Sequence, residues 1–527
     1  MPSRTGEGLK RWLAQVPGCL EAALTVKHAL MPPPAGAQPG EVFLGGLRAL
    51  DRIRPAAPGD ERRVLFFACR ESWLRLSLMT TVGLLARNCR VDFAYLPYRR
   101  VRSDDSLVDS KEMRFYYGRF LTGNRHPRLR FFDLTRVSPA PVSELMEEEA
   151  RSQGLLDTRW VLAREEVDIE ANPDHQAVYE FRRRRDFDTM RRFTSVLTDN
   201  LYDVVLIPHG NLRELGAAYR AARLLGRRIV SFDFKDRSEA VVLSDSGPVS
   251  EMNTSSEWTA DAPHVLSAGA RGRLEELLAS RRGTEWKGFT WAAQRSPYGG
   301  GAPGLIGNRR PGERVALMCP NVSWDSALLG RDRPFPSLAE WVRQTVRYFA
   351  GRTGCRLIVR VHPAEVIFGT AQPVSGIIRQ CCPSLPEHIQ VVGPEDPVNT
   401  YDLMEACDFG LVYNTTAGLE MAMHGIPAIV AGRPHYVEKG FTIDVNTAQE
   451  YRSAIESLIA DPRRLSERQT ELAWCYADVF FFRWHKPFPW CTRNFAEHLA
   501  RWPMDQVLRG DAWELFGPTF DQMAGRV

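Results

Sequence analysis

At 527 residues, the chain is too long for one ordinary domain, and roughly two to four domains are expected. Its 44% hydrophobic and 25% charged residues are typical of a globular protein and exclude a disordered or fibrous chain. With 68 basic against 64 acidic residues, the balance of charge gives no reason to expect nucleic acid as a partner.

The first half of the chain alternates between strands and helices. Residues 1–40 predict a helical preface that ends in a linker rich in proline and glycine. From Arg62 onwards, short apolar runs predict strands at 64–70, 91–98, 129–134, 202–211 and 228–234. Helical patterns between the strands are typical of a mostly parallel sheet with right-handed crossovers. Residues 41–279 are therefore predicted to form one Rossmann-type domain.

A highly charged segment from 143 to 200 is predicted to be mainly helical. It contains the run RRRR at Arg182–Arg185. We interpret this run as one solvated helix face, and a surface that recruits an anionic lipid or glycan is the alternative.

Residues 280–312 interrupt the alternation with a glycine cluster and few periodic apolar residues, so they are predicted to connect two domains. The strand and helix pattern resumes at residue 314, and residues 313–462 predict a second Rossmann-type domain. Residues 463–527 are rich in aromatic side chains and predict a helical tail. The expected fold class is thus α/β, with two doubly wound parallel-sheet domains that face a cleft.

Ten cysteines are spread along the chain without CxxC pairs, and several lie inside apolar segments. Such cysteines are typical of core residues in a reducing compartment, so we expect a cytoplasmic protein. No apolar run near the N-terminus is long enough for a signal or membrane helix. Peripheral attachment to a membrane complex stays open as an alternative.

The strongest local signal is NTTAGLE, where Asn414 ends a predicted strand and Thr415 and Thr416 start a helix. A helix start exposes N–H groups and the positive end of the helix dipole, which suits a phosphate. Gly418 permits close approach, and Glu420 is placed to bind the diol of a ribose. The alternative is that the threonines only cap the helix and that Glu420 is exposed.

The second signal is RVHP, at the end of another apolar strand. Arg360 and His362 are two residues apart and point to the same face of the strand. A guanidinium and an imidazole side by side can hold a phosphate, and a protonated His362 could neutralise a leaving phosphate. The alternative is a capping histidine and an arginine that pairs with Glu365.

Further polar residues follow other predicted strands of the second half. Asn321, Ser323 and Asp325 offer an amide, a hydroxyl and a carboxylate, although an Asx-rich turn at the start of a helix is equally compatible. Asp396 lies in a polar turn, and Tyr436 lies in the loop after the last apolar strand. Because ligands bind at the carboxyl ends of strands in doubly wound sheets, we expect these residues in one binding site.

In the first half, His209 and Asp233 end two predicted strands. If the two sheets face each other, these residues would supply the general base for an acceptor hydroxyl. A buried, hydrogen-bonded histidine is the alternative.

These motifs carry a resemblance. RVHPAE, the DP…TYDLM turn, VYNTTAGLEMAMHGIPAIVAG, HYVEKGFTID, NVSWDSA and YADVFFFRW resemble capsular polysaccharide biosynthesis proteins of the GT-B type, which include Kdo transferases. The HP and paired-hydroxyl elements are also similar to bacterial GT-B sialyltransferases, which use CMP-activated donors. The resemblance extends over residues 312–485. It implies that His362 contacts the donor phosphate, Thr415 and Thr416 its oxygens and Glu420 the ribose, with the turn at Asp396 near the nucleobase.

The resemblance therefore implies a metal-independent glycosyltransferase that needs no cofactor. It would transfer a sugar from a nucleotide-activated donor to a surface or capsular polysaccharide or glycolipid acceptor, in association with a capsule-assembly complex. A CMP-sugar such as CMP-Kdo is favoured, with UDP- and GDP-sugars as alternatives. Rival hypotheses are a UDP-N-acetylglucosamine 2-epimerase-like enzyme, a polyol-phosphate transferase, and a non-catalytic glycan-binding subunit.

Overall fold

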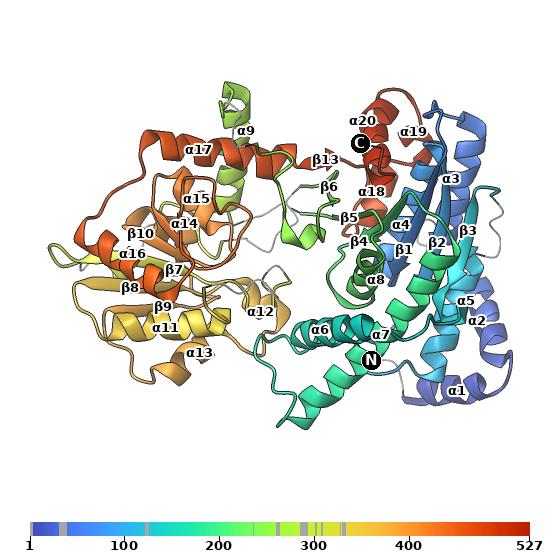
Figure 1. Cartoon of the computed structure of the whole chain (residues 1–527), viewed down its shortest axis with the longest axis horizontal. Coiled ribbons are helices and arrows are strands. Elements are labelled where there is room, and N and C mark those ends of the chain that lie inside the picture. Colours follow the sequence, from blue (N-terminus) through green and yellow to red (C-terminus); the bar gives the residue numbers. More distant parts are fainter. Residues whose placement is uncertain are drawn as a thin grey trace. The chain divides into compact units, whose positions relative to one another are not determined.

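The computed structural model describes residues 4–30, 39–121, 126–235, 237–259, 264–284, 294–300, 303–306, 309–326, 328 and 334–526. The chain forms two compact units, each built on its own sheet (Figure 1). Unit 1 contains Met1–Asp157, Ile169–Ser250 and Lys486–Val527, and unit 2 contains Thr158–Asp168 and Glu251–His485.

Unit 1 is built on a seven-stranded sheet in the order β13-β6-β5-β4-β1-β2-β3. The strands are β1 (Arg62–Cys69), β2 (Cys89–Leu96), β3 (Leu129–Asp133), β4 (Val204–Pro208), β5 (Ile229–Asp233), β6 (Ala240–Ser244) and β13 (His485–Pro487). The five strands from β3 to β5 pair in parallel and β6 pairs antiparallel with β5. The five predicted strands are therefore confirmed within a few residues, whereas β6 and β13 were not predicted.

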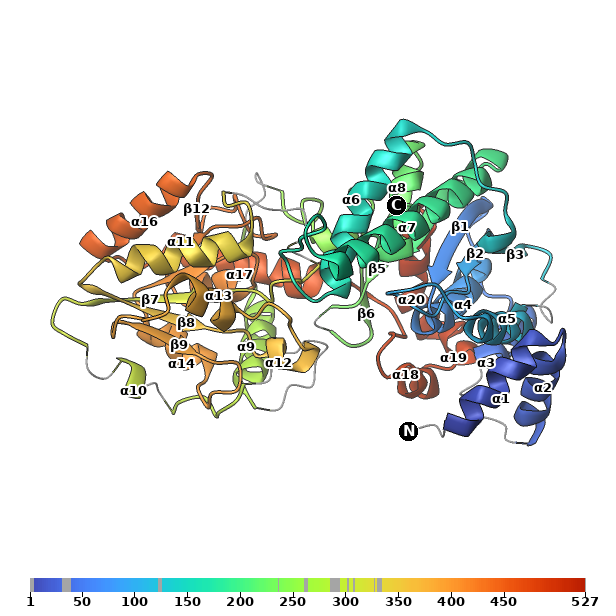
Figure 2. The ribbon, with the colours of Figure 1, turned by 90° about the horizontal axis from the view of Figure 1, so that it is seen from below.

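Helices cover both faces of this sheet (Figure 2). They are α1 (Arg4–Gln15), α2 (Cys19–Leu30), α3 (Pro39–Ile53), α4 (Glu71–Ala86), α5 (Leu107–Leu121), η1 (Leu134–Arg136), α6 (Glu144–Val161), α7 (Pro173–Asp199), α8 (Arg213–Leu224), η2 (Val249–Glu251), α18 (Phe495–Arg501), α19 (Met504–Val507) and α20 (Gly510–Met523). Apolar side chains of α6, α7 and α8 pack against alternate residues of the strands in one core. Successive side chains of each strand point to opposite faces of the sheet, so each strand packs against a layer of helices on both sides.

The arginine run in α7 does not form one solvated face, which corrects our interpretation. Arg182 is fully buried and binds Asp157 at 3.1 Å, Asp186 at 2.7 Å and Glu214 at 2.9 Å. Arg185 is also buried, and only Arg184 has a largely exposed side chain. Because α7 packs against α8 and α6, the helix repeat turns two of the four arginines inward.

Unit 2 is built on a six-stranded parallel sheet in the order β12-β11-β10-β7-β8-β9. The strands are β7 (Arg314–Cys319), β8 (Cys355–Arg360), β9 (Ile389–Val392), β10 (Phe409–Val412), β11 (Ala428–Val430) and β12 (Ile443–Asp444). The helices are α9 (Ala268–Arg282), α10 (Pro303–Ile306), α11 (Leu338–Ala350), α12 (Ala364–Phe368), α13 (Val374–Cys381), α14 (Thr400–Ala406), α15 (Ala417–Met423), α16 (Ala448–Ala460), α17 (Glu467–Asp478) and the π-helical turn η3 (Val479–Arg483).

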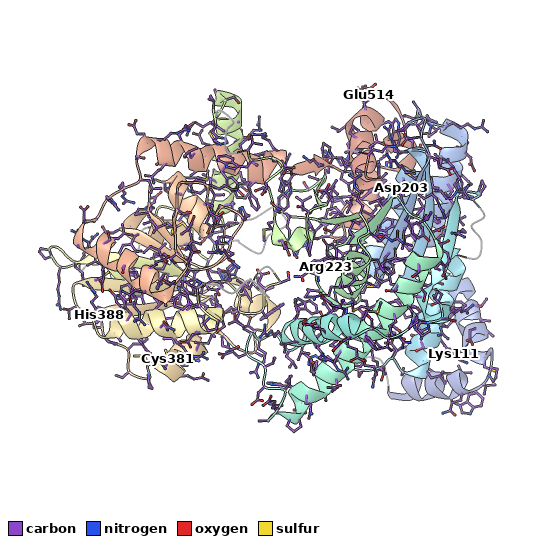
Figure 3. The ribbon with its side chains drawn as sticks, viewed as in Figure 1. Lys111, Asp203, Arg223, Cys381, His388 and Glu514 are labelled. Atoms are coloured by element: carbon purple, nitrogen blue, oxygen red, sulfur yellow. The ribbon has the colours of Figure 1, made fainter. Side chains whose placement is uncertain are left out.

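One face of this sheet is covered by α11, α13 and α16, which share a core with the strands (Figure 2). Figure 3 labels Cys381 and His388, at the two ends of the segment that leads from α13 into β9. The His388 ring lies 2.8 Å from the carbonyl oxygen of Phe349, which ties the start of β9 to the end of α11. The predicted fold class, two Rossmann-type sheets with a helical C-terminal region, is confirmed.

The unit boundaries differ from the predicted domain limits. Residues 251–282, including α9, belong to unit 2, as do α17 and η3 of the predicted tail. Trp474 in α17 donates to the carbonyl of Met423 at 2.8 Å, whereas Phe488 donates to the carbonyl of Glu239 in unit 1 at 3.0 Å. The tail is thus divided between the units because each part binds a different sheet. The predicted linker at 32–40 lies mostly outside the described residues.

Each sheet has one position where the strand order reverses. In unit 1 the chain runs outward through β1, β2 and β3, then returns to β4 on the other side of β1. In unit 2 the reversal lies between β7 and β10. In doubly wound sheets ligands bind in the crevice outside the carboxyl ends of the strands at such a switch point.

Candidate functional site

A pocket with about 570 Å³ of empty space, part of it open to solvent, lies at the switch point of unit 2. Residues after β7, β8 and β10 line it together with residues of α14, α15 and α9. Five predicted residues are brought together there: Arg360, His362, Thr415, Thr416 and Glu420.

Arg360 is the last residue of β8 and only 2% exposed. Its guanidinium donates to Thr400 Oγ1 at 3.3 Å, to the carbonyl of Val398 at 3.4 Å and to the carbonyl of Gly393. Over the described parts of the chain, no carboxylate lies within 4.0 Å of it, and the proposed pairing with Glu365 is not formed. Burial lowers the pKa of Arg360. The direct partners of Arg360 are thus neutral groups, while the more distant charge of Asp396 raises its pKa and that of Arg295 lowers it.

His362 combines both roles that its motif left open. Its Nδ1 accepts the N–H of Ala364 at 3.1 Å and thereby caps α12, while the ring lines the pocket. Burial lowers the pKa of His362 to about 4, against the opposing effect of Asp325. The ring is therefore neutral at pH 7, and its proton is on Nε2, because Nδ1 is an acceptor. In this structure His362 offers a neutral N–H donor to the pocket, rather than the protonated ring that we expected.

Thr415 and Thr416 precede α15 at the end of β10. Thr415 Oγ1 accepts the N–H of Ala417 at 3.3 Å, so the predicted capping is made by Thr415. Thr416 has no capping bond; its hydroxyl donates to Glu420 at 3.0 Å and accepts from Arg281 at 3.3 Å. The alternative of threonines that only cap is thus too narrow, since both also line the pocket.

Glu420 is 3% exposed, which excludes the exposed surface position of the alternative interpretation. Its carboxylate accepts the hydroxyls of Thr416 and Tyr401 and lies 3.1 Å from the guanidinium of Arg281. These internal partners already use most of its acceptor capacity. Glu420 therefore lines the pocket and holds the Arg281 guanidinium in place. Its contact with a ribose stays a prediction.

The sequence analysis missed Arg281 and Tyr401. Arg281 is the second-last residue of α9, it is buried, and its guanidinium lies 5.2 Å from the ring of Phe481 in η3. Neither residue belongs to a motif at a strand end. Tyr401 was visible inside the TYDLM segment, but Arg281 is more than a hundred residues from its partners, and no local pattern indicates it.

Asn321 and Asn414 lie at the same edge of the sheet but are not among the residues that line the pocket. Asn321 Oδ1 accepts the N–H of Asn414 at 2.9 Å, and Asn414 Oδ1 accepts the N–H of Arg433 at 2.6 Å. These two amides tie the ends of β7, β10 and the segment after β11 together. Ser323 likewise donates to the carbonyl of Gln372 at 3.0 Å.

Gly418 and Tyr436 form one contact. A Cβ atom on Gly418 would lie 2.3 Å from the Tyr436 hydroxyl, so the close approach that glycine permits is made by Tyr436. The fully buried Tyr436 donates to the carbonyl of Thr415 at 2.6 Å. Both residues thus set the path of the chain through Thr415 rather than lining the pocket.

Two predicted acids are placed differently. Asp325 lies near enough to His362 for its charge to raise the pKa of the ring. Asp396 is exposed, and its carboxylate accepts the N–H of Gly393 at 2.7 Å within its own turn. Within the described ranges, no three His, Cys, Asp or Glu side chains are grouped as a metal ion needs.

In unit 1, His209 follows β4, and Asp233 is the last residue of the adjacent strand β5. The N–H of His209 donates to the carbonyl of Phe232 at 2.7 Å, and Asp233 lies 3.4 Å from Lys235. The two residues therefore share the carboxyl edge of the first sheet, and their role as a general base stays a prediction. None of the helices in the described ranges combines the length and apolar character of a membrane span.

Comparison with known proteins identifies a relationship for part of the chain. Residues 312–464 match the family described as "Capsule polysaccharide biosynthesis protein", which confirms the predicted resemblance over this segment. A search of curated proteins gives no match.

Several solved structures are similar over larger parts of the chain. "Thermosulfurimonas dismutans KpsC, beta Kdo 2,4 transferase" is 18% identical, covers 52% of this chain and 79% of its own, and has a TM-score of 0.31. The "beta Kdo 2,7 transferase" of the same organism is 12% identical over 54% and 79%, with a TM-score of 0.30. A UDP-GlcNAc 2-epimerase from Neisseria meningitidis is 12% identical over 84% and 99%, with a TM-score of 0.24.

Proposed function

We propose that this chain is a glycosyltransferase of capsular polysaccharide synthesis, which transfers a sugar from a nucleotide-activated donor to a glycan acceptor. The observation that carries the proposal is the cationic pocket at the switch point of unit 2, where Arg360, His362 and two threonines converge. The match of residues 312–464 to the capsule biosynthesis family supports it.

In this proposal, the donor phosphate binds between Arg360 and His362. Three N–H groups of the guanidinium are used by the wall, and an arginine has five, so donors remain for a ligand. The Nε2–H of His362 and the hydroxyl of Thr415 add neutral donors. A phosphate is thus held by one positive charge and several oriented hydrogen bonds.

The same groups would stabilise the departing nucleotide. When the bond between the anomeric carbon and the phosphate oxygen breaks, its electron pair stays on the phosphate, whose negative charge grows. Donors that are already oriented stabilise this charge without further reorganisation. The acceptor oxygen forms the new bond to the sugar and releases its proton to a base, for which His209 and Asp233 are our candidates. In this proposal no cofactor takes part, and the Arg360 guanidinium and the Nε2–H of His362 take the place of a divalent metal ion.

The charge of the pocket favours a CMP-sugar, such as CMP-Kdo. Two arginines line the pocket; Arg281 is balanced by Glu420, whereas Arg360 has no carboxylate partner within the described ranges. The charges of Asp396 and Arg295 act on the pKa of Arg360 in opposite directions, which leaves about one positive charge beside a neutral histidine. One positive charge matches the single charge of a phosphodiester better than the two charges of a pyrophosphate. A UDP- or GDP-sugar would need a further cation.

Two variants of His362 test the proposal because its ring nitrogens have separate tasks. His362→Asn keeps an acceptor for the Ala364 N–H and deletes the Nε2 donor, whereas His362→Gln places an N–H near the position of Nε2 and loses the cap. We expect His362→Asn to melt within a few degrees of the wild type and to lose nucleotide binding and sugar transfer. His362→Gln should be less stable and keep part of the affinity.

The measurement is isothermal titration of the full chain with CMP, UDP and GDP, followed by transfer assays with the sugars of the nucleotide that binds. Wild-type affinity for that nucleotide in His362→Asn would overturn the proposed phosphate site. Binding of no nucleotide would instead support the non-catalytic subunit. Conversion of UDP-GlcNAc without any acceptor would support the epimerase-like alternative.

A further inference from the structure

Unit 1 has a switch point of its own, between β1 and β4. The parallel register pairs Phe66 with Leu206, so Cys69 lies level with His209, and Arg70 lies level with Gly210. Arg213 follows three residues later, at the start of α8. The crevice outside these strand ends is the position where a doubly wound sheet binds a ligand.

The backbone is strained at this edge. Arg70, His209 and Arg213 have φ values of 71°, 60° and 55°, in the left-handed region that side chains with a Cβ disfavour. Arg70 and His209 directly follow the ends of β1 and β4, and Arg213 is the first residue of α8. Strained non-glycine residues persist where the surroundings hold them in place, and they gather at functional sites. The strain holds two arginine side chains at the switch point.

Arg70 contributes an unbalanced positive charge. Its side chain is partly exposed, and in the described portion of the chain no carboxylate lies within 4.0 Å of its guanidinium. Arg213 is buried and close enough for the charge of Arg70, after burial itself, to lower the pKa of Arg213 to about 10. Two like charges at one crevice favour an anion between them.

The acids beneath the edge are engaged by another arginine. Glu214 binds Arg182 at 2.9 Å, and Asp157 binds Arg182 at 3.1 Å while accepting the backbone N–H of Arg213 at 2.6 Å. This buried cluster supports the strand ends from below. Its carboxylates pair with Arg182, and the charges of Glu214 and Asp157 also raise the pKa of Arg213. In the described ranges none of them lies within 4.0 Å of the Arg70 guanidinium.

We propose that Arg70 and Arg213 bind an anionic group, a carboxylate or a phosphate, of a negatively charged sugar at the switch point of unit 1. Guanidinium groups recognise both anions through paired N–H donors. The sugar's identity as the glycan acceptor rests on the proposed function, whereas the anion site itself does not. An anchor at Arg70 would place a sugar hydroxyl near His209, after the neighbouring strand β4, and Asp233, at the end of the next strand β5.

The test measures the binding of glucuronic acid, glucose 6-phosphate and glucose to the full chain by ligand-observed NMR titration. We expect at least one of the two acids to bind, and neutral glucose to bind at least tenfold more weakly. The acid that binds more tightly identifies a carboxylate or a phosphate as the preferred group. Failure of both acids to bind the wild type overturns the proposal.

Variants locate the site. Arg70→Gln should weaken binding of the preferred acid about tenfold. Arg70→Lys keeps the charge but not the paired N–H donors, so it should lose less affinity than Arg70→Gln. The matched control is Arg90→Gln, which removes an exposed arginine at the opposite, amino-terminal end of the neighbouring strand β2. Unchanged acid binding in Arg70→Gln, or an equal loss in Arg90→Gln, would overturn the assignment.

A third variant separates charge from folding. Arg70→Gly removes the guanidinium but adopts the left-handed backbone without strain, so its melting temperature should equal or exceed that of the wild type. It should bind the acid as weakly as Arg70→Gln. If it melts lower while keeping its affinity, Arg70 has a structural role only.

The same samples distinguish this proposal from the proposed function. His362→Asn should lose nucleotide binding and keep acid binding, and Arg70→Gln should show the reverse. If the protein binds the acid but no nucleotide, the anion site is supported and the proposed glycosyltransferase function is refuted. Loss of acid binding in His362→Asn would show that the acid occupies the pocket of unit 2, which refutes a site at Arg70.

Discussion

Replacing Gly418 by alanine tests how the chain is held at Thr415. The added Cβ would lie 2.3 Å from the hydroxyl oxygen of Tyr436, 2.9 Å from its Cζ and 3.0 Å from a methyl carbon of Val412. Since unbonded atoms of this kind rest near 3.5 Å, the hydroxyl has to retreat by about 1 Å. Tyr436 is fully buried, so its retreat disturbs the core and breaks its bond to the Thr415 carbonyl.

The expected cost has two parts. Loss of the buried hydrogen bond costs about 1 kcal/mol, and overpacking of a filled core costs about 1–3 kcal/mol. Gly418→Ala should therefore destabilise unit 2 by about 2–4 kcal/mol, although alanine is the better helix former. Because Thr415 lines the pocket, the variant should also bind nucleotide more weakly.

The assay is urea unfolding of the full chain, with hydrogen exchange of the peptide that covers residues 415–423 as the local readout. Gly376→Ala in α13 is the matched control, because its Cβ would lie 3.5 Å from the nearest atom, in Pro373. We expect that helix to gain up to about 1 kcal/mol.

A double variant identifies the colliding atom. Tyr436→Phe alone loses the bond to Thr415. Combined with Gly418→Ala it should be less destabilising than the sum of the single changes by about 1 kcal/mol, since the clashing oxygen is gone. Strict additivity, or a Gly418→Ala protein as stable as the wild type, would refute the reasoning.

Two further changes probe buried charge in unit 2. Burial raises the pKa of Glu365 from an ordinary 4.5 to about 7. The folded state thus binds the proton more tightly, stability falls as pH rises from about 4.5 to about 7, and the loss totals about 3 kcal/mol. Glu365→Gln, which keeps an acceptor for Val374, should flatten this dependence in urea unfolding at pH 5 and pH 8; parallel curves would contradict the assignment. Arg281→Met and Glu420→Gln should each cost about 3–5 kcal/mol, because each leaves the other's charge buried alone. The double variant should cost less than their sum in the same assay, and additive free energies would mean that the pair is not coupled.

The two sheets could be predicted because parallel strands are buried on both faces. Such strands are continuous apolar runs, as in β1 and β8, and the polar residues that follow them mark the carboxyl edge. The order of the strands then brings the ends of β7, β8 and β10 together. This is why Arg360, His362 and Thr415 could be placed in one pocket from local patterns alone.

Short or antiparallel strands escaped the prediction. β6 pairs antiparallel with β5, and β13 has three residues contributed from far along the chain. Neither has the length or the flanking helix that marks a βαβ unit. The division of the C-terminal tail between the units depends on the same long-range pairing, which no local pattern encodes.

The hydrogen-bond partner of each polar side chain at a strand end could not be predicted from the local sequence either. Asn321 and Asn414 resemble ligand residues in the sequence, yet each spends its side-chain oxygen on a backbone N–H of a neighbouring segment. Thr415 is similar in type and position but lines the pocket as well as capping its helix. Whether one of these oxygens accepts a backbone N–H depends on how the segments after the strands are arranged in three dimensions.

Charge shows the same limit most clearly. The arginines at 182, 281 and 360 are chemically identical, and all three are buried. Arg182 is surrounded by three carboxylates and Arg281 is paired with Glu420, so neither guanidinium lacks an anionic partner. Arg360 is held by two carbonyls and a hydroxyl, which orient its guanidinium without neutralising it. A buried cation without an anionic partner is costly unless an anion joins it. For this reason our proposal places the donor phosphate at Arg360 rather than at the more heavily charged cluster around Arg182.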